Sequence, residues 1–83
     1  QTDDAASMAE REAHVRTALG ELPEDYRDVV MAHYHDDLGL QEIAQKFAES
    51  ESAVRSRLHR ARVRLRATLN ATPLGREISE AAA

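Results

Sequence analysis

Apolar residues recur at three- and four-residue spacing along most of this chain, which is the pattern of amphipathic helices. A first helix is predicted over about residues 8–19, where Val15, Ala18 and Leu19 share one face. Gly20 follows at a position that can end a helix. The ordered part of the chain is therefore predicted to begin with a short helix.

A second helix is predicted from Pro23, because the fixed φ and missing N–H of proline suit the first helical position. Glu24 and Asp25 follow in the first turn, where the helix dipole favours negative charge. The helix should end at Asp36–Asp37. Its buried face is predicted to contain Tyr26, Val29 and Val30, and it can extend to His33 and Tyr34.

A short third helix and a long fourth helix follow. Gly39 is the predicted N-cap of the third helix, and Glu42 lies where a capping box reaches back to the cap. This helix should stop near Ala48–Glu49, and Ser50 should cap a helix over about residues 51–69, roughly 28 Å long. The inward residues of the two helices are predicted to be Ile43, Ala44, Phe47, Val54, Leu58, Ala61, Leu65 and Leu69.

The composition agrees with this pattern. The chain has only three glycines and two prolines, and Ala, Leu, Glu and Arg dominate, which favours helix nearly everywhere. We predict an all-α fold without a sheet, a four-helix domain over residues 8–70 that ends in a helix-turn-helix. Residues 1–7 are predicted to be a linker. Residues 71–83 are predicted to be a flexible or weakly helical tail, because Pro73 and Gly75 close the predicted ordered part.

Length and cysteine content narrow the classes of function. A domain of 83 residues buries only about 60% of the surface of its unfolded chain, which leaves little room for an enclosed active site. The absence of cysteine excludes disulfides and thiolate zinc sites. No apolar run approaches the roughly 20 residues needed to span a bilayer, and no signal-peptide pattern opens the chain. Because the chain starts with Gln1 rather than methionine, we expect a fragment of a longer protein.

Charge is distributed unevenly along the chain. Residues 1–51 hold thirteen acidic and four basic residues, whereas no acidic residue occurs between Ser52 and Asn70. This second stretch carries six arginines within twelve positions, namely Arg55, Arg57, Arg60, Arg62, Arg64 and Arg66. A basic helix attached to an acidic body is typical of a protein that binds phosphates.

The last two predicted helices, with a turn of three or four residues between them, match a helix-turn-helix. Helical projection places one face of the longer helix opposite its leucines. The residues on or beside this outward face are Ser52, Ala53, Arg55, Ser56, His59, Arg60, Val63 and Ala67. Its small residues let the helix approach the floor of a major groove, where serine and arginine hydrogen-bond base edges. The residues at the sides, where phosphates would run, are Arg57, Arg62, Arg64 and Arg66.

A solvated charged face is the plain alternative. Such a face usually interleaves acids and bases at four-residue spacing, and only Glu51–Arg55 fits that pattern. The other five arginines have no acidic partner on their own helix, although the acidic first half of the chain can supply partners across the fold. For any single arginine, a solvated surface position explains its presence better than a contact with a DNA base does.

Enzymatic and metal-binding functions find no support in the pattern. His33 and His35 are two positions apart, so a regular helix directs them about 200° apart and they cannot chelate one metal. The serines near the turn lack a histidine or aspartate in a nucleophile-like order. The aromatic residues are predicted to lie in the core, with the tyrosine hydroxyls at its rim, and these are Tyr26, Tyr34 and Phe47. We predict no catalytic residue, metal, cofactor or small-molecule substrate.

Four motifs occur in order at characteristic gaps, LPEDYR at 22–27, HYHDDL at 33–38, QEIA at 41–44 and AVRSRLHRARVRL at 53–65. In these motifs the chain resembles region 4, the C-terminal promoter-binding domain, of extracytoplasmic-function sigma factors in the sigma-70 family. The match covers about residues 8–69. The pairing of LPEDYR with VRSRLHRAR is far more specific than a generic helix-turn-helix.

The resemblance implies a four-helix, winged-helix-like domain of the sigma region 4 type, whose last helix reads the −35 promoter element in the major groove. It implies docking on the β flap of the RNA polymerase core, frequent capture by an anti-sigma factor, and a bacterial cytoplasmic location with no membrane contact. The positions that face promoter DNA in the family are Arg55, Ser56, His59 and Arg60 here. Gln41 and Glu42 match positions near the DNA backbone.

Three positions depart from the family pattern. The turn usually carries glycine and then an apolar residue, whereas this chain has Ala48 and Glu49. Alanine in a left-handed conformation costs roughly 1 kcal/mol or more because its Cβ crowds the carbonyl. Either the turn differs in geometry or the domain accepts some strain. Glu49 cannot be buried unpaired, so we expect it to point outward and to weaken phosphate contact near the turn. Gly39 replaces a serine cap at the start of the third helix.

Two other functions share this fold. A helix-turn-helix output domain of a response regulator would lack the paired motifs and would usually dimerise on paired half-sites. A sigma-like mimic would bind an anti-sigma factor without DNA and should have lost outward basic residues such as Arg55 and Arg60, both of which are present. Anti-sigma capture and DNA binding can also coexist on one domain.

Overall fold

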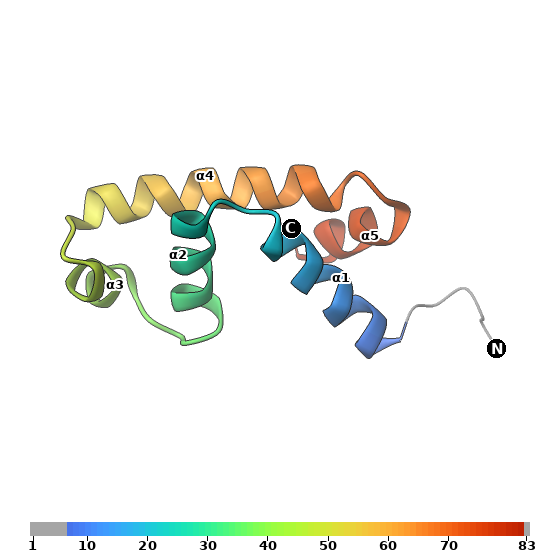
Figure 1. Cartoon of the computed structure of the whole chain (residues 1–83), viewed down its shortest axis with the longest axis horizontal. Helices are drawn as coiled ribbons and strands as arrows, with labels where there is room; N and C mark the ends of the chain where they lie inside the picture. Colours follow the sequence, from blue (N-terminus) through green and yellow to red (C-terminus); the bar gives the residue numbers. More distant parts are fainter. Residues whose placement is uncertain (1–6, 83) are drawn as a thin grey trace.

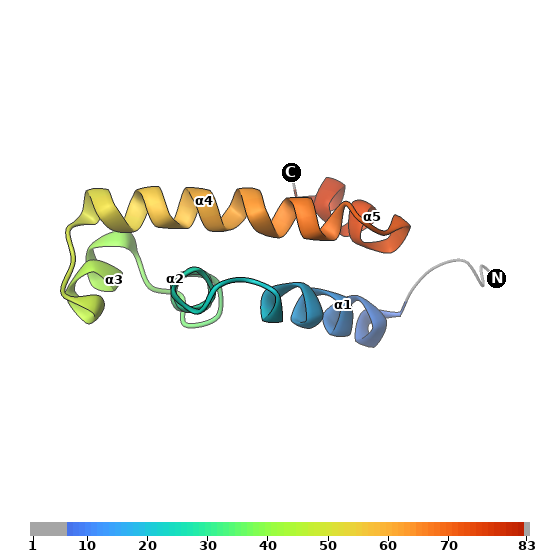
Figure 2. The same cartoon turned by 45° about the horizontal axis from the view of Figure 1, so that its top comes forward.

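The computed structural model describes residues 7–82, and within them it shows helices and no strand. The helices are α1 (Met8–Gly20), α2 (Glu24–Tyr34), α3 (Leu40–Phe47), α4 (Glu51–Leu69) and α5 (Pro73–Ala82). The all-α prediction is confirmed, and the predicted linker lies outside the described residues except for Ser7. Figures 1 and 2 show α4 as the long axis, with α2 and α3 beside its N-terminal half and α1 and α5 beside its C-terminal half. No helix in this described part is both long and apolar enough to cross a membrane.

Local hydrogen bonds explain where the helices start. At α1, the Glu10 N–H donates to Ser7 Oγ at 3.1 Å and the Ser7 N–H donates to Glu10 Oε1 at 2.9 Å. The bond from the Ser7 backbone is the main reason that the pKa of the Glu10 carboxyl lies below its usual value. At α3, the predicted reach of Glu42 is confirmed, because the Gly39 N–H donates to Glu42 Oε1 at 2.8 Å. Pro23 is the N-cap of α2, so this helix starts one residue later than predicted.

The core forms where α2, α3 and α4 meet. Val29, Ile43 and Val54 are fully buried and come one from each of these helices. The predicted stripe of α4 is confirmed, since Val54, Leu58, Ala61 and Leu69 are buried and Leu65 is half-buried. Burial of this stripe leaves the opposite face of α4 exposed to solvent.

The aromatic residues lie at the edge of this core. Tyr26 and Phe47 are half-buried and pack against it. Tyr34 is 58% exposed, so its predicted core position is wrong. Because Tyr34 is the last residue of α2, its ring packs edge-on against His33 and beside Arg62 instead of entering the core.

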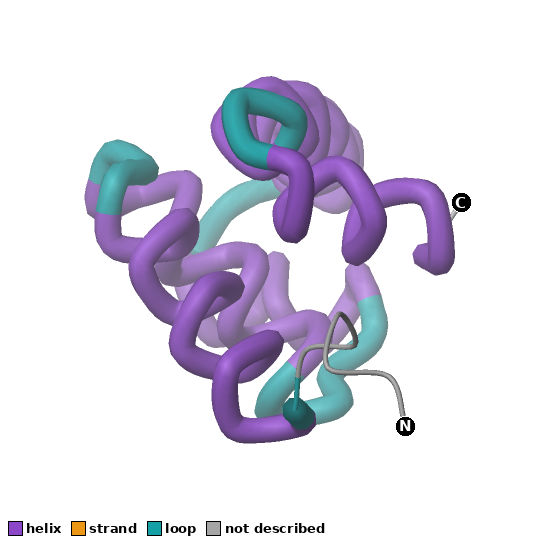
Figure 3. Tube along the Cα trace, turned by 90° about the vertical axis from the view of Figure 1, so that its right-hand side faces the viewer, coloured by secondary structure: helices purple, strands orange, loops and turns teal. Residues whose placement is uncertain are grey.

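The C-terminal segment forms a helix, where the sequence leaves a flexible or a weakly helical tail open. The sequence predicts that Pro73 and Gly75 close the ordered part, but they open α5, which packs on α1 and α4 (Figure 3). Thr72 Oγ1 accepts a hydrogen bond from the Gly75 N–H at 3.0 Å and lies 2.8 Å from His14 Nε2. Gly75 is buried, and a Cβ added there would lie 1.9 Å from the Leu69 carbonyl oxygen. The glycine therefore permits a close approach of two helices.

Candidate nucleic-acid interface

The helix-turn-helix consists of α3, a turn at residues 48–50, and α4. Ala48 adopts the left-handed conformation, with φ 56° and ψ 46°. Around it, the Glu49 N–H donates to the Ala44 carbonyl at 2.9 Å and the Ala48 N–H donates to the Gln45 carbonyl at 3.3 Å. This pair of bonds ends a helix in a Schellman motif. The turn thus keeps the left-handed geometry, and the domain accepts the strain of an alanine there.

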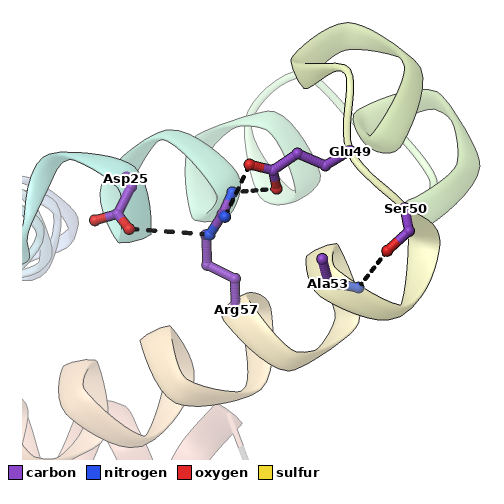
Figure 4. A network of polar contacts seen from close by, with 5 residues as sticks. All are labelled: Asp25, Glu49, Ser50, Ala53 and Arg57. Carbon is purple, nitrogen blue, oxygen red and sulfur yellow. Dashed lines mark hydrogen bonds and ion pairs between the residues drawn. The ribbon is translucent and has the colours of Figure 1, made fainter.

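The start of α4 presents short side chains. Ser50 caps the helix as predicted, because its Oγ accepts a hydrogen bond from the Ala53 N–H at 3.1 Å (Figure 4). Ser52, Ala53 and Ser56 are all exposed. Such small residues leave the helix backbone close to whatever lies against this face, which is what entry into a groove requires.

Charged side chains extend from the same face. Arg55, His59 and Arg60 are exposed, as helical projection predicts. Among residues 7–82, no carboxylate lies within ion-pair distance of Arg55 or Arg60. Each guanidinium therefore keeps its five donors and its charge for a ligand. Val63 and Ala67 are also exposed and continue this face along α4.

Two further arginines lie against tyrosine rings of α2. Arg62 Nε donates to the Tyr34 hydroxyl at 2.6 Å, and its guanidinium lies 5.4 Å from the ring centroid. The Arg64 guanidinium lies 5.9 Å from the ring centroid of Tyr26. An aromatic face restrains a guanidinium without neutralising its charge, so both arginines stay available to phosphates, as does the exposed Arg66. No spacing in the sequence links these residues, so the pattern did not reveal the contacts.

Arg57 differs from the other arginines of α4. Its Nη1 lies 2.6 Å from Glu49 Oε1 and its Nη2 lies 2.9 Å from Glu49 Oε2, while its Nε lies 3.9 Å from Asp25 Oδ2 (Figure 4). The hydrogen bond to Glu49 is the main cause that raises the pKa of Arg57. The sequence predicts Arg57 beside phosphates and Glu49 pointing outward, but the structure turns these two side chains toward each other. The sequence feature that indicates this ion pair is Glu49 itself, an acidic residue at a turn position where the family has an apolar residue.

The remaining candidate residues lie at the edges of this surface. Gln41 is exposed in the first turn of α3. His33 is half-buried, with its Nδ1 3.0 Å from the Leu38 carbonyl oxygen, whereas His35 Nδ1 lies 3.0 Å from Asp36 Oδ1. The two histidines thus have separate partners. Within the described residues, no group of three or more potential metal-ligating side chains lies close enough together to hold a metal ion.

Comparison with known proteins places this chain in a family. The family model of sigma-70, region 4, matches residues 13–65. The RNA polymerase sigma factor SigV of Bacillus subtilis (strain 168) is 35% identical over 51 residues, an alignment that covers 61% of this chain and 31% of that protein. The chain therefore spans less than a third of its relative's length. No solved structure matches the chain.

The matched segment runs from within α1 into the second half of α4, and it includes all of α3, the turn and residues 51–65 of α4. It contains the exposed residues at the start of α4 and the cluster around Arg57. Region 4 is a regulatory domain of sigma factors and not an enzyme family. The family model covers more than half of the chain, and the chain therefore belongs to the sigma-70 region 4 family.

Proposed function

We propose that this chain is the promoter-binding domain of an extracytoplasmic-function sigma factor, which reads the −35 element and helps to recruit RNA polymerase. The observation that carries the proposal is the exposed face of α4, where Arg55 and Arg60 project beside the short side chains of Ser52 and Ser56. Membership of the sigma-70 region 4 family supports the same function.

On this proposal the N-terminal half of α4 lies in the major groove. A groove about 12 Å wide admits an α-helix, which is about 10–12 Å across with its side chains. Arg60 is assigned to base reading, because a bidentate contact of arginine with guanine is the commonest specific contact. Arg55, Ser56 and His59 act beside it on the same face, and Gln41 at the start of α3 approaches the DNA backbone.

The arginines at the side of α4 are assigned to phosphates. Arg62, Arg64 and Arg66 are exposed, and the tyrosine rings beside the first two restrain their guanidinium groups. Each phosphate that an arginine neutralises releases a counterion from the DNA. The affinity for DNA is therefore expected to weaken steeply as salt is added.

The proposed partners follow from the family. They are promoter DNA, the β flap of the RNA polymerase core and an anti-sigma factor, all in the bacterial cytoplasm. The relative is named an RNA polymerase sigma factor, which supports the link to polymerase. Because the chain spans only 31% of that relative, we propose for it the part of the activity that concerns the −35 element.

The test is binding to a library of DNA duplexes at two salt concentrations, with Arg60→Ala beside the parent. We expect the variant to lose about 1–3 kcal/mol of binding free energy, concentrated at one or two base positions. Arg16→Ala changes an exposed arginine on α1, outside the helix-turn-helix, and this matched control should bind like the parent.

Three other outcomes would revise the proposal. A uniform loss across all sequences would make Arg60 a phosphate contact. A requirement for paired half-sites would favour the output domain of a response regulator. No binding by the parent at low salt would contradict the proposal and favour a mimic that binds an anti-sigma factor without DNA.

A further inference from the structure

Three segments of the chain meet at the guanidinium of Arg57. Arg57 lies on α4, Glu49 lies in the turn and Asp25 lies in the first turn of α2 (Figure 4). The two terminal nitrogens of Arg57 contact the two carboxylate oxygens of Glu49 at 2.6 and 2.9 Å, and its Nε faces Asp25 at 3.9 Å. A bidentate pair of this kind fixes orientation as well as distance.

This cluster is shielded from solvent in part. The Arg57 side chain is 24% exposed and that of Glu49 is 32% exposed, so salt screens their attraction less than that of a fully exposed pair. The other arginines of α4 are exposed, and none of them has a carboxylate partner within residues 7–82. Arg57 is therefore the arginine of α4 that is least available to a ligand.

Glu49 is held at both its backbone and its side chain. Glu49 directly follows the left-handed Ala48, and its N–H donates a hydrogen bond to the Ala44 carbonyl oxygen at 2.9 Å, at the end of α3. Its carboxylate holds Arg57, eight residues further on in α4. One residue thus ties the end of α3 to the first turns of α4. The angle between these helices decides how the second one enters a groove, because the first crosses the DNA backbone.

From this geometry we infer that Arg57 is a positioning residue. Glu49 and Asp25 hold its guanidinium, so that it sets the angle between α3 and α4 and does not bind a phosphate. The inference rests on the proposed function, since it takes α4 to be the element that lies on DNA. Moving Arg57 to a phosphate would leave the Glu49 carboxylate partly buried, unpaired and close to a polyanion, which is costly.

The two roles for Arg57 predict opposite effects of Glu49→Gln. A positioning role predicts that discrimination between the preferred duplex and a scrambled duplex falls several-fold, while the slope of log Kd against log salt stays unchanged. A phosphate role predicts that the freed arginine tightens binding to both duplexes, steepens the slope by about 1 and leaves discrimination intact. This second result would overturn the inference.

Glu51→Gln is the matched control for charge. Glu51 lies in the first turn of α4, is exposed, and forms no ion pair with residues 7–82. Its substitution removes the same charge close to Glu49 without touching Arg57. Discrimination by Glu51→Gln should equal that of the parent, and a loss as large as that of Glu49→Gln would overturn the inference.

Substitution of the arginine completes the DNA test. Arg57→Gln should lower discrimination and keep the salt slope, whereas Arg64→Gln should lower the slope by about 1 and keep discrimination. Arg57→Lys keeps the charge and loses the bidentate fork, so it should also lose discrimination and will serve if Arg57→Gln does not fold. Parent-like discrimination by Arg57→Lys would overturn the inference.

A measurement without DNA tests the cluster itself. In thermal unfolding, Glu49→Gln and Arg57→Gln should each lower Tm, and the double variant should lower it little further, because both changes break the same pair. Additive losses would overturn the inference.

A parent that binds no duplex at low salt would overturn the proposed function as well, whereas a parent that binds DNA while Arg57→Gln behaves like Arg64→Gln would overturn the inference alone.

Discussion

The left-handed residue of the turn gives a quantitative test of the structure. Ala48→Gly removes one methyl group, and Ala48 is exposed, so almost no packing is lost. The backbone bonds of Glu49 and Ala48 to the end of α3 are unaffected, because they use main-chain atoms. The change in stability therefore reports the conformational strain of an alanine at this position.

The magnitude follows from the backbone angles. At φ 56° and ψ 46°, the Cβ of an L-residue costs about 1–2 kcal/mol. Glycine has more freedom in the unfolded chain, which offsets about 0.4–1 kcal/mol of the gain. The difference lies between about 0 and 1.6 kcal/mol. Its centre, a net stabilisation of about 0.8 kcal/mol, corresponds to a rise in Tm of about 3–6 °C for a domain of this size.

Thermal unfolding followed by circular dichroism measures this change. Ala67→Gly is the matched control, because Ala67 is exposed in the interior of α4 and has ordinary helical geometry. There glycine should destabilise by about 0.5–1 kcal/mol. A Tm of Ala48→Gly at or below that of the parent would refute the left-handed strain at this turn.

Two further predictions concern helix ends. Gly75→Ala places a Cβ 1.9 Å from the Leu69 carbonyl oxygen, so α5 should detach and the free energy of unfolding should fall by about 1–3 kcal/mol. Gly20→Ala is the matched control, because its new Cβ has no neighbouring atom within 4 Å. Equal Tm values for the two variants would contradict the close approach at Gly75. The pKa of Glu10 is lowered from its ordinary value of 4.5. The ionised Glu10 carboxylate therefore stabilises α1 fully above pH 4.5, and this stabilisation is lost as the pH falls through the lower pKa of the folded state. Far-ultraviolet circular dichroism should show α1 fraying over that range in the parent but not in Glu10→Gln, and identical acid profiles would speak against the capping box.

Features that depend on neighbouring residues could be predicted from the sequence. The cap at Ser50 and the reach of Glu42 to Gly39 involve residues three positions apart, so residue type and spacing reveal them. The buried stripe through Val54 and Leu58 follows from helical periodicity in the same way. The same periodicity also predicts that the opposite, outward face of α4 is exposed.

The sequence leaves a flexible or a weakly helical C-terminal tail open, because two helix-breaking residues have other uses here. Pro73 opens α5, as proline does at a first helical position. Gly75 lets that helix approach the Leu69 carbonyl, which is a tertiary contact. No local pattern separates a glycine that ends a helix from one that permits close packing.

The partners of Arg57 could not be assigned for a related reason. Asp25 and Glu49 come from other segments, and only the fold brings them to α4. The sequence showed an acidic residue in the turn but did not show which cation it would meet. The same holds for the tyrosine rings beside Arg62 and Arg64.

The salt dependence of DNA affinity tests most directly whether α4 offers its cations to DNA. If Arg62, Arg64 and Arg66 each neutralise one phosphate, log K against log salt should have a slope of about −3 on duplex DNA. Replacing all three by glutamine should remove most of that slope. An affinity of the parent that does not change between about 50 and 200 mM salt, or no binding at the lower concentration, would contradict the account.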